Sequence, residues 1–295
     1  MEFIQQLFNG ITLGSVYALI ALGYTMVYGI VKLINFAHGD LLMVGAFSAY
    51  FVLTILGVSP ATLVLAFIIS MAVCALFGVV IEKTCYKPLR NAPKINALIT
   101  AIGVSLLLEN GARVIPIIGA NPKQFPTFSS VVYNFFGVTV SLVQIVELGI
   151  SILLMIILNY IVNYTKVGKA MRAVSFDRDA AQLMGIDVNK IISFTFALGA
   201  ALAAAAGILF ASAYPQVEPY MGIMPGLKAF VAAVLGGIGS IPGAMIGGFI
   251  MGIAETLTKG LLTSKLADAI AFGILILILV IRPSGILGKN IREKV

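Results

Sequence analysis

The chain has 295 residues, of which 60% are hydrophobic and 11% are charged, and its mean hydropathy is +1.07. This composition excludes a soluble protein. A formal net charge of +7 does not indicate nucleic-acid binding either, because fourteen of the nineteen Lys and Arg residues gather in four short stretches between apolar runs. Clustering of this kind is the positive-inside bias that sets the orientation of a membrane protein.

Apolar runs of about 20 residues recur along the chain, the length that a helix needs to cross a hydrocarbon core of roughly 30 Å. Lipid offers no hydrogen-bond partner to a bare backbone, so we expect these runs to be helical. The sequence therefore predicts an all-α polytopic membrane protein, with one transmembrane domain over residues 1–295 and eight or nine transmembrane or re-entrant helices. The predicted spans cover residues 7–29, 38–57, 60–82, 95–118, 138–162, 190–212, 224–238, 241–258 and 266–282.

The positions of the basic stretches predict how the chain lies in the membrane. If every span crosses, an N-terminus outside the cell places all four stretches and the C-terminus in the cytoplasm. The run over 224–238 is short and rich in glycine, so it either crosses or forms a re-entrant half-helix. The basic stretches are Lys32, Lys83–Lys94, Lys166–Lys190 and Arg282–Lys294.

The first helical run is followed by a break over residues 29–40. Asn35, His38 and Asp40 stand in it between two apolar runs. Backbone that is freed at membrane depth must be buried in protein or line a wet cavity. We expect these three side chains to satisfy the backbone of the break; the alternative is a proton-coupling role for His38, the only histidine of the chain.

A second break covers residues 215–242, where Pro and Gly interrupt the helical pattern. Each break follows a long helix rich in small residues, over 13–29 in the first half of the chain and 198–214 in the second. On the predicted topology these two helices run in opposite directions. This arrangement is typical of an inverted repeat with broken helices at its centre.

The second break and the run after it hold a lysine and a ladder of glycines. Lys228 stands near the start of the short helix, where a cation opposes the helix dipole, so we expect it to pair with Glu218 or Glu255 or to face the transport pathway. The glycines have small-xxx-small spacing, which predicts close helix packing, within one bundle or at a subunit interface. This glycine ladder consists of Gly236, Gly237, Gly239, Gly243, Gly247, Gly248 and Gly252.

Other ionisable residues fall inside the predicted spans, where a charge is costly and therefore marks a candidate functional site. Glu109 and Arg113 are four residues apart, as are Glu255 and Lys259, which is the spacing of an ion pair within one helix. Near span ends such pairs are more often structural, with the long side chains reaching toward water. Glu147 has no partner at this spacing.

The segment Lys166–Lys190 concentrates five Lys or Arg and three Asp residues in a chain that otherwise avoids charge. It predicts two short helices, of which the second is capped by Ser175 or Asp177 and stops at Gly185 in the left-handed conformation. A helix of about eight residues is not stable alone in water, so its apolar stripe must dock, on this chain's own helix ends or on a partner. The stripe consists of Phe176, Ala180, Leu183 and Met184.

The centre of this segment is Asp179-Ala180-Ala181, followed after three residues by Gly185, and it resembles the EAA-xxx-G signature of bacterial ABC-importer permeases. In that family the signature lies in a cytoplasmic loop, here residues 163–190, whose coupling helix seats in a cleft of the nucleotide-binding subunit. Asp179 stands where the family has Glu. The resemblance implies an ATPase-coupling site made of Phe176, Asp179, Ala180, Ala181, Leu183, Met184 and Gly185.

Longer stretches, over residues 13–47, 167–188 and 227–255, resemble the branched-chain amino acid permeases of the high-affinity Liv system. The overall length matches the shorter, LivH-type subunit. The resemblance implies a permease in the bacterial inner membrane, paired with a second permease subunit or with a copy of itself. It also implies two cytoplasmic ATPase subunits that bind ATP and Mg²⁺, and an amino-acid-binding protein outside. Related permeases carry urea or short amides, which are the alternative substrates.

The chain itself carries no motif for ATP hydrolysis or for another enzyme activity. Neither Gly168-Lys169 nor Gly288-Lys289 has the upstream glycine of a phosphate-binding loop. No HExxH motif and no nucleophile–base constellation is found. We therefore expect a transport subunit without catalytic residues, metal ligands or a cofactor of its own.

Two hypotheses about transport follow. In the first, partner ATPases drive alternating access, and both breaks lie along the pathway. In the second, a stand-alone secondary transporter or channel uses Glu147, His38 or Asp40 for ion coupling, and such a protein has no need of the charged segment. The pathway predicted by the first hypothesis contains Asn35, His38, Asp40, Pro225, Lys228, Gly236, Gly237 and Gly239.

Overall fold

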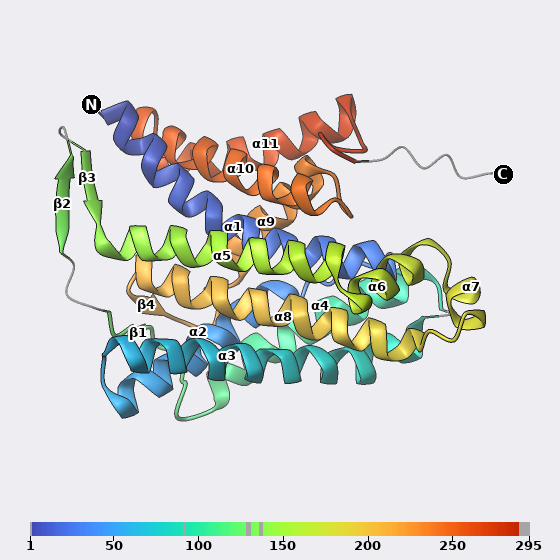
Figure 1. Cartoon of the computed structure of the whole chain (residues 1–295). Helices are drawn as coiled ribbons and strands as arrows, with labels where there is room; N and C mark the ends of the chain where they lie inside the picture. Colours follow the sequence, from blue (N-terminus) through green and yellow to red (C-terminus); the bar gives the residue numbers. More distant parts are fainter. Residues whose placement is uncertain (1, 91, 128–130, 136–137, 289–295) are drawn as a thin grey trace.

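A computed structural model describes residues 2–90, 92–127, 131–135 and 138–288, and helices dominate it (Figure 1). Eight of the described helices are long and apolar enough to cross a membrane, and α9 is shorter. The predicted all-α polytopic fold is confirmed. Residues 289–295, with most of the last basic stretch, lie outside the described residues. The elements are α1 (Glu2–Val31), α2 (His38–Leu56), α3 (Pro60–Ile81), a π-helical turn (Glu82–Tyr86), a 3₁₀ turn (Lys87–Leu89), α4 (Lys94–Val114), β1 (Lys123–Gln124), β2 (Val132–Phe135), β3 (Val138–Ser141), α5 (Leu142–Tyr164), α6 (Lys166–Phe176), α7 (Arg178–Leu183), α8 (Val188–Ala213), β4 (Gln216–Val217), α9 (Ile223–Gly236), α10 (Ile241–Leu261) and α11 (Ser264–Ile281).

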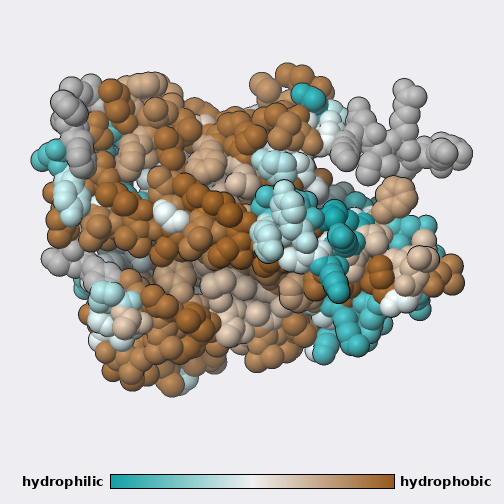
Figure 2. Space-filling model, in the orientation of Figure 1, coloured by the Kyte–Doolittle hydropathy of each residue, from teal (hydrophilic) through white to brown (hydrophobic). Residues whose placement is uncertain are grey.

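The bundle has two different ends. α6 and α7 lie at one end, where hydrophilic residues gather on the surface, and we call it the basic end (Figures 1 and 2). The β-strands lie at the other end, where β2 and β3 form a hairpin and β1 pairs antiparallel with β4. Between the two ends the surface seen in Figure 2 is mainly hydrophobic. Such a belt fits a surface that faces lipid.

α1 and α8 form the centre of the bundle and run in opposite directions (Figure 1). Both are rich in Gly and Ala, which allow neighbouring helices to approach closely. α1 packs against α9 and α10, whereas α8 packs against α3 and α2. The two halves of the chain therefore repeat one arrangement in opposite directions, as an inverted repeat predicts.

α2 follows the first break and α9 lies within the second, and both helices begin inside the bundle, where their N-termini meet. After α1, Lys32 adopts a left-handed conformation with φ 59°, and α2 then begins at His38. A Cβ built on Gly39 would lie 2.8 Å from the carbonyl oxygen of Gly222 and 3.2 Å from the Cα of Gly226, at the start of α9. Only glycines permit this approach of two helix ends. Broken helices thus meet at the centre of the repeat.

The run predicted over 224–238 passes through the bundle, but only part of the passage is helical. From α8 the chain passes through β4 at the strand end and turns inward to α9, which has 14 residues. The backbone N–H groups of Ile286 and Leu287 donate to the carbonyls of Leu235 and Gly236, which fastens the last turn of α9 to the segment after α11. The alternatives of crossing and re-entrance are therefore combined: a short non-helical stretch enters the bundle, and the half-helix α9 leaves it.

The glycine ladder packs within one bundle. A Cβ on Gly243 or Gly247 would meet the backbone of α9, and one on Gly248 or Gly252 would meet the backbone of α1. α10 therefore needs glycine on two faces to touch two neighbours at once. Packing inside the chain accounts for these four glycines, rather than a subunit interface.

Several helix boundaries differ from the predicted ones, among them the start of α1, which lies at Glu2 and not at residue 7. The run predicted over 138–162 begins as strand β3, and α5 starts only after Ser141. The Ser141 hydroxyl accepts from the Gln144 N–H at 3.2 Å, and the Gln144 side chain accepts from the Ser141 N–H at 3.0 Å. This capping box fixes the start of the helix. α4 ends at Val114, about a turn earlier than predicted.

Candidate functional site

At the basic end, α6 is held against the bundle by its cap and its buried face. The Thr165 hydroxyl accepts a backbone N–H of the first turn at 3.1 Å. Met171 and Val174 are buried, and the Arg172 guanidinium donates to the carbonyl oxygen of Val162 in α5. α6 is therefore a fixed arm that carries α7.

α7 is a short helix with both ends defined by the sequence. The Asp177 carboxylate accepts from the N–H groups of Asp179 and Ala180, each at 2.9 Å, so Asp177 rather than Ser175 is the cap. Gly185 ends the turn with φ 82°, as predicted. The two predicted short helices are thus confirmed.

The large apolar residues around α7 point into solvent. Phe176, Leu183 and Met184 expose 95%, 88% and 83% of their surface, and we call these three residues the apolar tip. Ala181 is the buried residue of α7. Phe176 is the last residue of α6, so the prediction of one stripe on one helix is wrong. The alternative that these side chains dock on the chain's own helix ends is also wrong.

Arg178 ties α7 to the end of α1. Its guanidinium donates to the carbonyl oxygens of Ile30 at 3.1 Å and Val31 at 2.8 Å. Carbonyls in the last turn of a helix lack partners within it, and the helix dipole favours a cation there. Partial burial, followed by the nearby Arg90 charge, lowers the pKa of Arg178, but a guanidinium remains protonated in proteins. The contact joins the apolar tip to the central helix.

The residues of the first break contact other helices. The Tyr86 hydroxyl, at the end of the π-helical turn after α3, donates to Asn35 Oδ1 at 2.9 Å. The His38 ring lies edge-on to Tyr24 of α1, with 4.7 Å between ring centroids. Asp40 is buried and faces α4. The side chains of Asn35 and His38 contact Tyr86 and Tyr24 instead of the backbone of the break. For these two residues, the expectation that they satisfy that backbone is not met.

Lys228 belongs to a network of charges that joins four helices. Its Nζ lies 2.8 Å from Glu255 Oε1 in α10 and 2.7 Å from Asp268 Oδ1 in α11. Glu255 also receives the Lys259 ammonium at 2.6 Å and the Tyr17 hydroxyl of α1 at 2.7 Å. The predicted pairing of Glu255 with Lys228 and with Lys259 is confirmed. We call these five residues the charged network, which is neutralised within the chain.

The ion pair predicted between Glu109 and Arg113 does not form. Arg113 donates instead to the Tyr220 hydroxyl at 2.6 Å and stacks near its ring. Glu109 is buried beside Asp40. Helical spacing makes the first two residues neighbours, but partners from other elements lie closer to each.

The remaining predicted pathway residues lie in or after α9. Pro225 and Lys228 are buried in this helix, and Gly236 ends it. Gly237 and Gly239, with φ 104° and 97°, form the turn into α10. Gly239 also lines a cavity of about 480 Å³ at the basic end, between α1, α6 and this turn. The pathway role of these residues stays a prediction.

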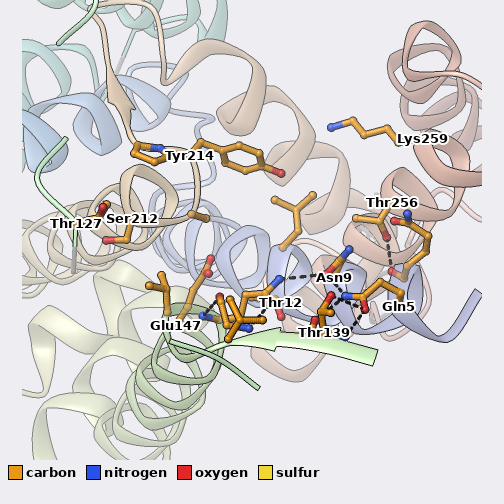
Figure 3. A pocket seen from close by; sticks show the side chains of 18 residues that line it. Gln5, Asn9, Thr12, Thr127, Thr139, Glu147, Ser212, Tyr214, Thr256 and Lys259 are labelled. Atoms are coloured by element: carbon orange, nitrogen blue, oxygen red, sulfur yellow. Dashed lines mark hydrogen bonds between the residues drawn. The ribbon is translucent and has the colours of Figure 1, made fainter. Parts of the chain in front are cut away.

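A larger cavity, of about 670 Å³, lies at the strand end of the bundle (Figure 3). Its walls come from α1, the segment at Thr127, β2, β3, α5, the end of α8 and α10, so no local motif could predict it. Glu147, Tyr214 and Lys259 line it from three different elements. The one sequence signal was Glu147, a carboxylate in a span without a partner. An apolar pocket of about 340 Å³ adjoins the cavity and also has Glu147 in its wall.

Proteins of known type match the chain over nearly its whole length. Residues 6–279 match the family described as branched-chain amino acid transport system / permease component. The high-affinity branched-chain amino acid transport system permease protein LivH of Escherichia coli (strain K12) is 43% identical, over 100% of this chain and 98% of LivH. The equivalent protein BraD of Pseudomonas aeruginosa has the same identity and coverage. The ribose import permease protein RbsC of Escherichia coli is 28% identical, over 94% of this chain and 85% of RbsC.

Proposed function

The chain belongs to the family of branched-chain amino acid transport system permease components, and on that premise we propose how it works. It is a membrane permease subunit of an ABC importer for leucine, isoleucine and valine. The two full-length relatives at 43% identity are permeases for branched-chain amino acids, so neither urea or short amides nor ion-coupled transport is favoured. RbsC is more distant and is named for ribose.

The observation that carries the coupling proposal is the apolar tip. Burial of apolar side chains is favourable by about 25 cal/mol for each Å² of apolar surface removed from water. This chain leaves the three side chains of the apolar tip exposed. We propose that a cleft on a partner ATPase subunit covers them. α7 then seats in the cleft, with Asp179, Ala180, Ala181 and Gly185 forming the seated helix and its stop.

We propose that the basic end faces the cytoplasm. The described parts of all four basic stretches lie at this end, together with α6 and α7, which agrees with the positive-inside rule. The first residues of α1 and the strands then lie outside. Two ATPase subunits bind at the cytoplasmic side, an amino-acid-binding protein docks outside, and a second permease subunit or a copy of this chain completes the pore.

The contacts support a route for the coupling motion. ATP binding closes the ATPases and shifts the apolar tip, and Arg178 passes the shift to the last turn of α1. The first break follows directly, and α2 begins where it meets α9. We propose that a relative movement of these two helix ends opens the pathway to alternate sides. Asn35, His38 and Asp40 lie beside this meeting point.

The complete importer in proteoliposomes tests the proposed function. We expect radiolabelled leucine to accumulate only when ATP is present on the ATPase side and the binding protein is on the other. Urea should not accumulate under the same conditions. Leucine uptake that continues without ATP and follows a proton gradient would show a secondary transporter instead.

A further inference from the structure

We propose that the cavity at the strand end and its adjoining apolar pocket form one binding subsite for a zwitterionic amino acid with an apolar side chain. In this subsite Glu147 receives the ammonium group of the ligand. The inference rests on the proposed function and deepens it, because it names the place where the permease itself holds its substrate. None of the residues predicted for the pathway lines this cavity.

Glu147 is the feature that makes the cavity a built site. Glu147 is 2% exposed, and among the described residues its buried Oε2 atom has no hydrogen-bond partner. Burial without a partner disfavours an ionised carboxylate, and a cation placed beside it favours the ionised form. Figure 3 shows the Glu147 carboxylate at the cavity. Glu147 lies in α5, whose start is fixed by the Ser141 capping box. The cavity therefore lacks a cation at one defined point.

Cationic and hydroxyl groups lie across the cavity from Glu147. Lys259 and Tyr214 both line it, and they project from α10 and from the end of α8 (Figure 3). The Lys259 ammonium has three donors, of which one reaches Glu255 at 2.6 Å. Its other donors remain for a ligand carboxylate. Opposite charges on opposite walls match the two ends of a zwitterion.

Amide groups near the start of α1 add polar groups to the lining of the cavity. Asn9 accepts through Oδ1 from the Gln5 amide at 3.2 Å and from the Gln144 amide at 3.1 Å. Its own NH₂ group is thereby turned to donate, since the carbonyl side is occupied. The network fixes an amide donor at the polar wall, where a carboxylate accepts well.

The apolar pocket fits a branched aliphatic side chain. Its volume of about 340 Å³ adjoins a polar cavity of about 670 Å³, and ligand sites typically measure about 300–1,000 Å³. Glu147 lies in the wall of both, so a ligand whose ammonium group binds there can place its side chain in the apolar pocket. Other walls of this pocket are formed by Leu63, Phe67, Val143, Val146, Ile150 and Leu209.

The full-length chain in nanodiscs, without partner proteins, allows a direct test. We expect saturable binding of radiolabelled L-leucine. Glu147→Gln should weaken it by about tenfold or more, because an ion-assisted hydrogen bond is lost. Isocaproate, which lacks the ammonium group, and isoamylamine, which lacks the carboxylate, should compete poorly with leucine on the wild-type chain. On Glu147→Gln, isocaproate should lose this disadvantage.

Two variants separate a binding role from a structural one. Glu218→Gln removes a carboxylate at the same end of the bundle but outside the cavity, and it should bind leucine like the wild type. Glu147→Gln should have a melting temperature at or above that of the wild type, since the change removes a buried carboxyl group that lacks a hydrogen-bond partner. A lower melting temperature with leucine affinity unchanged would assign Glu147 to structure and overturn the proposal.

Other outcomes overturn the subsite without touching the proposed function. Wild-type chain without saturable leucine binding, or Glu147→Gln with wild-type affinity, rejects the subsite. If Glu147→Gln binds leucine normally but no longer assembles with the second permease subunit, the cavity is a subunit contact. Uptake by the complete importer is measured in parallel. ATP-driven leucine uptake in any of these cases leaves the proposed function standing, and its absence from the wild type rejects that function separately.

Discussion

The apolar tip and the charged network both reverse the usual distribution of residues in a membrane protein. The tip holds three large apolar side chains in water, whereas the network holds ions within the spans. The difference lies in their partners. Each ion in the network has a counter-ion in the same chain, but nothing in the described residues covers the tip. The pairs among Lys228, Glu255 and Asp268 therefore serve the fold of this chain, and we propose that the tip serves another molecule.

The largest effect is expected from breaking the charged network. Lys228→Met leaves the buried Glu255 with one cation fewer and removes the partner of the half-exposed Asp268. The free energy of unfolding should fall by about 3 kcal/mol, at the lower end of the range for a broken buried pair, because Lys259 and Tyr17 still reach Glu255. Unfolding experiments in mixed micelles measure this change in the free energy of unfolding. The control Lys265→Met, exposed on α11, should change little, and equal losses in both variants would contradict the network's role.

A smaller effect, of a different kind, is expected at the apolar tip. Leu183→Asp should leave the stability of the isolated chain within about 0.5 kcal/mol of the wild type, because the side chain is exposed. Its affinity for the ATPase subunits should fall about 30-fold, as expected for a central residue of an interface. The affinity for the ATPase subunits, measured in nanodiscs, distinguishes a loss of docking from a loss of stability. Val167→Ala, on α6 outside the tip, is the matched control, and an equal loss there would remove the tip's special role.

The link between the apolar tip and the end of α1 should give an effect of about 1 kcal/mol, typical of one hydrogen-bonding group at a partly exposed site. Arg178→Met removes both bonds to the carbonyls at the end of α1. Amide exchange in α7 should become faster, while ATPase affinity changes little. Transport per ATP hydrolysed should also fall, because the tip then moves without α1. Unchanged exchange in α7 would show that α6 alone holds the tip.

The smallest effect concerns pH at the start of α8. The Asp187 carboxylate accepts from the Lys190 N–H at 3.1 Å, and this backbone hydrogen bond lowers the pKa of Asp187. A lowered pKa in the folded state stabilises the fold above the ordinary value of about 3.9, and this stabilisation is lost as the pH falls through the lowered value. Asp187→Asn keeps a cap that does not titrate. The difference in melting temperature from the wild type should be constant near neutral pH and change only in acid.

Much of this fold could be predicted from hydropathy and from local stop signals. Hydropathy placed the spans, because lipid demands helices of a fixed length, and Asp177 and Gly185 defined α7 through their own side-chain and backbone chemistry. The start of α5 was missed because a hairpin strand and a helix share the apolar residues near 138. Capping by Ser141 decides the boundary, and hydropathy does not register it.

The parts of the site that depend on distant segments could not be predicted. Spacing on one helix predicted the Glu255–Lys259 pair correctly and the Glu109–Arg113 pair wrongly. In the second case Arg113 contacts Tyr220, which belongs to a different part of the chain. Helical spacing predicts only neighbours on one helix. The cavity around Glu147 likewise needs several separate segments of the chain. The carboxylate itself could be noticed, but not the walls that surround it.

The most direct test of the docking of α7 uses Gly185. A Cβ built there has no atom within 4 Å, and the φ of 82° is unfavourable for any other residue. Gly185→Ala therefore carries the backbone strain alone, whereas Gly185→Trp adds bulk to the surface that docks. We predict that the Ala variant keeps most of its ATPase co-purification and ATP-driven leucine uptake, and that the Trp variant loses both while remaining folded. Wild-type association and uptake in the Trp variant would contradict the docking of α7 on the ATPase.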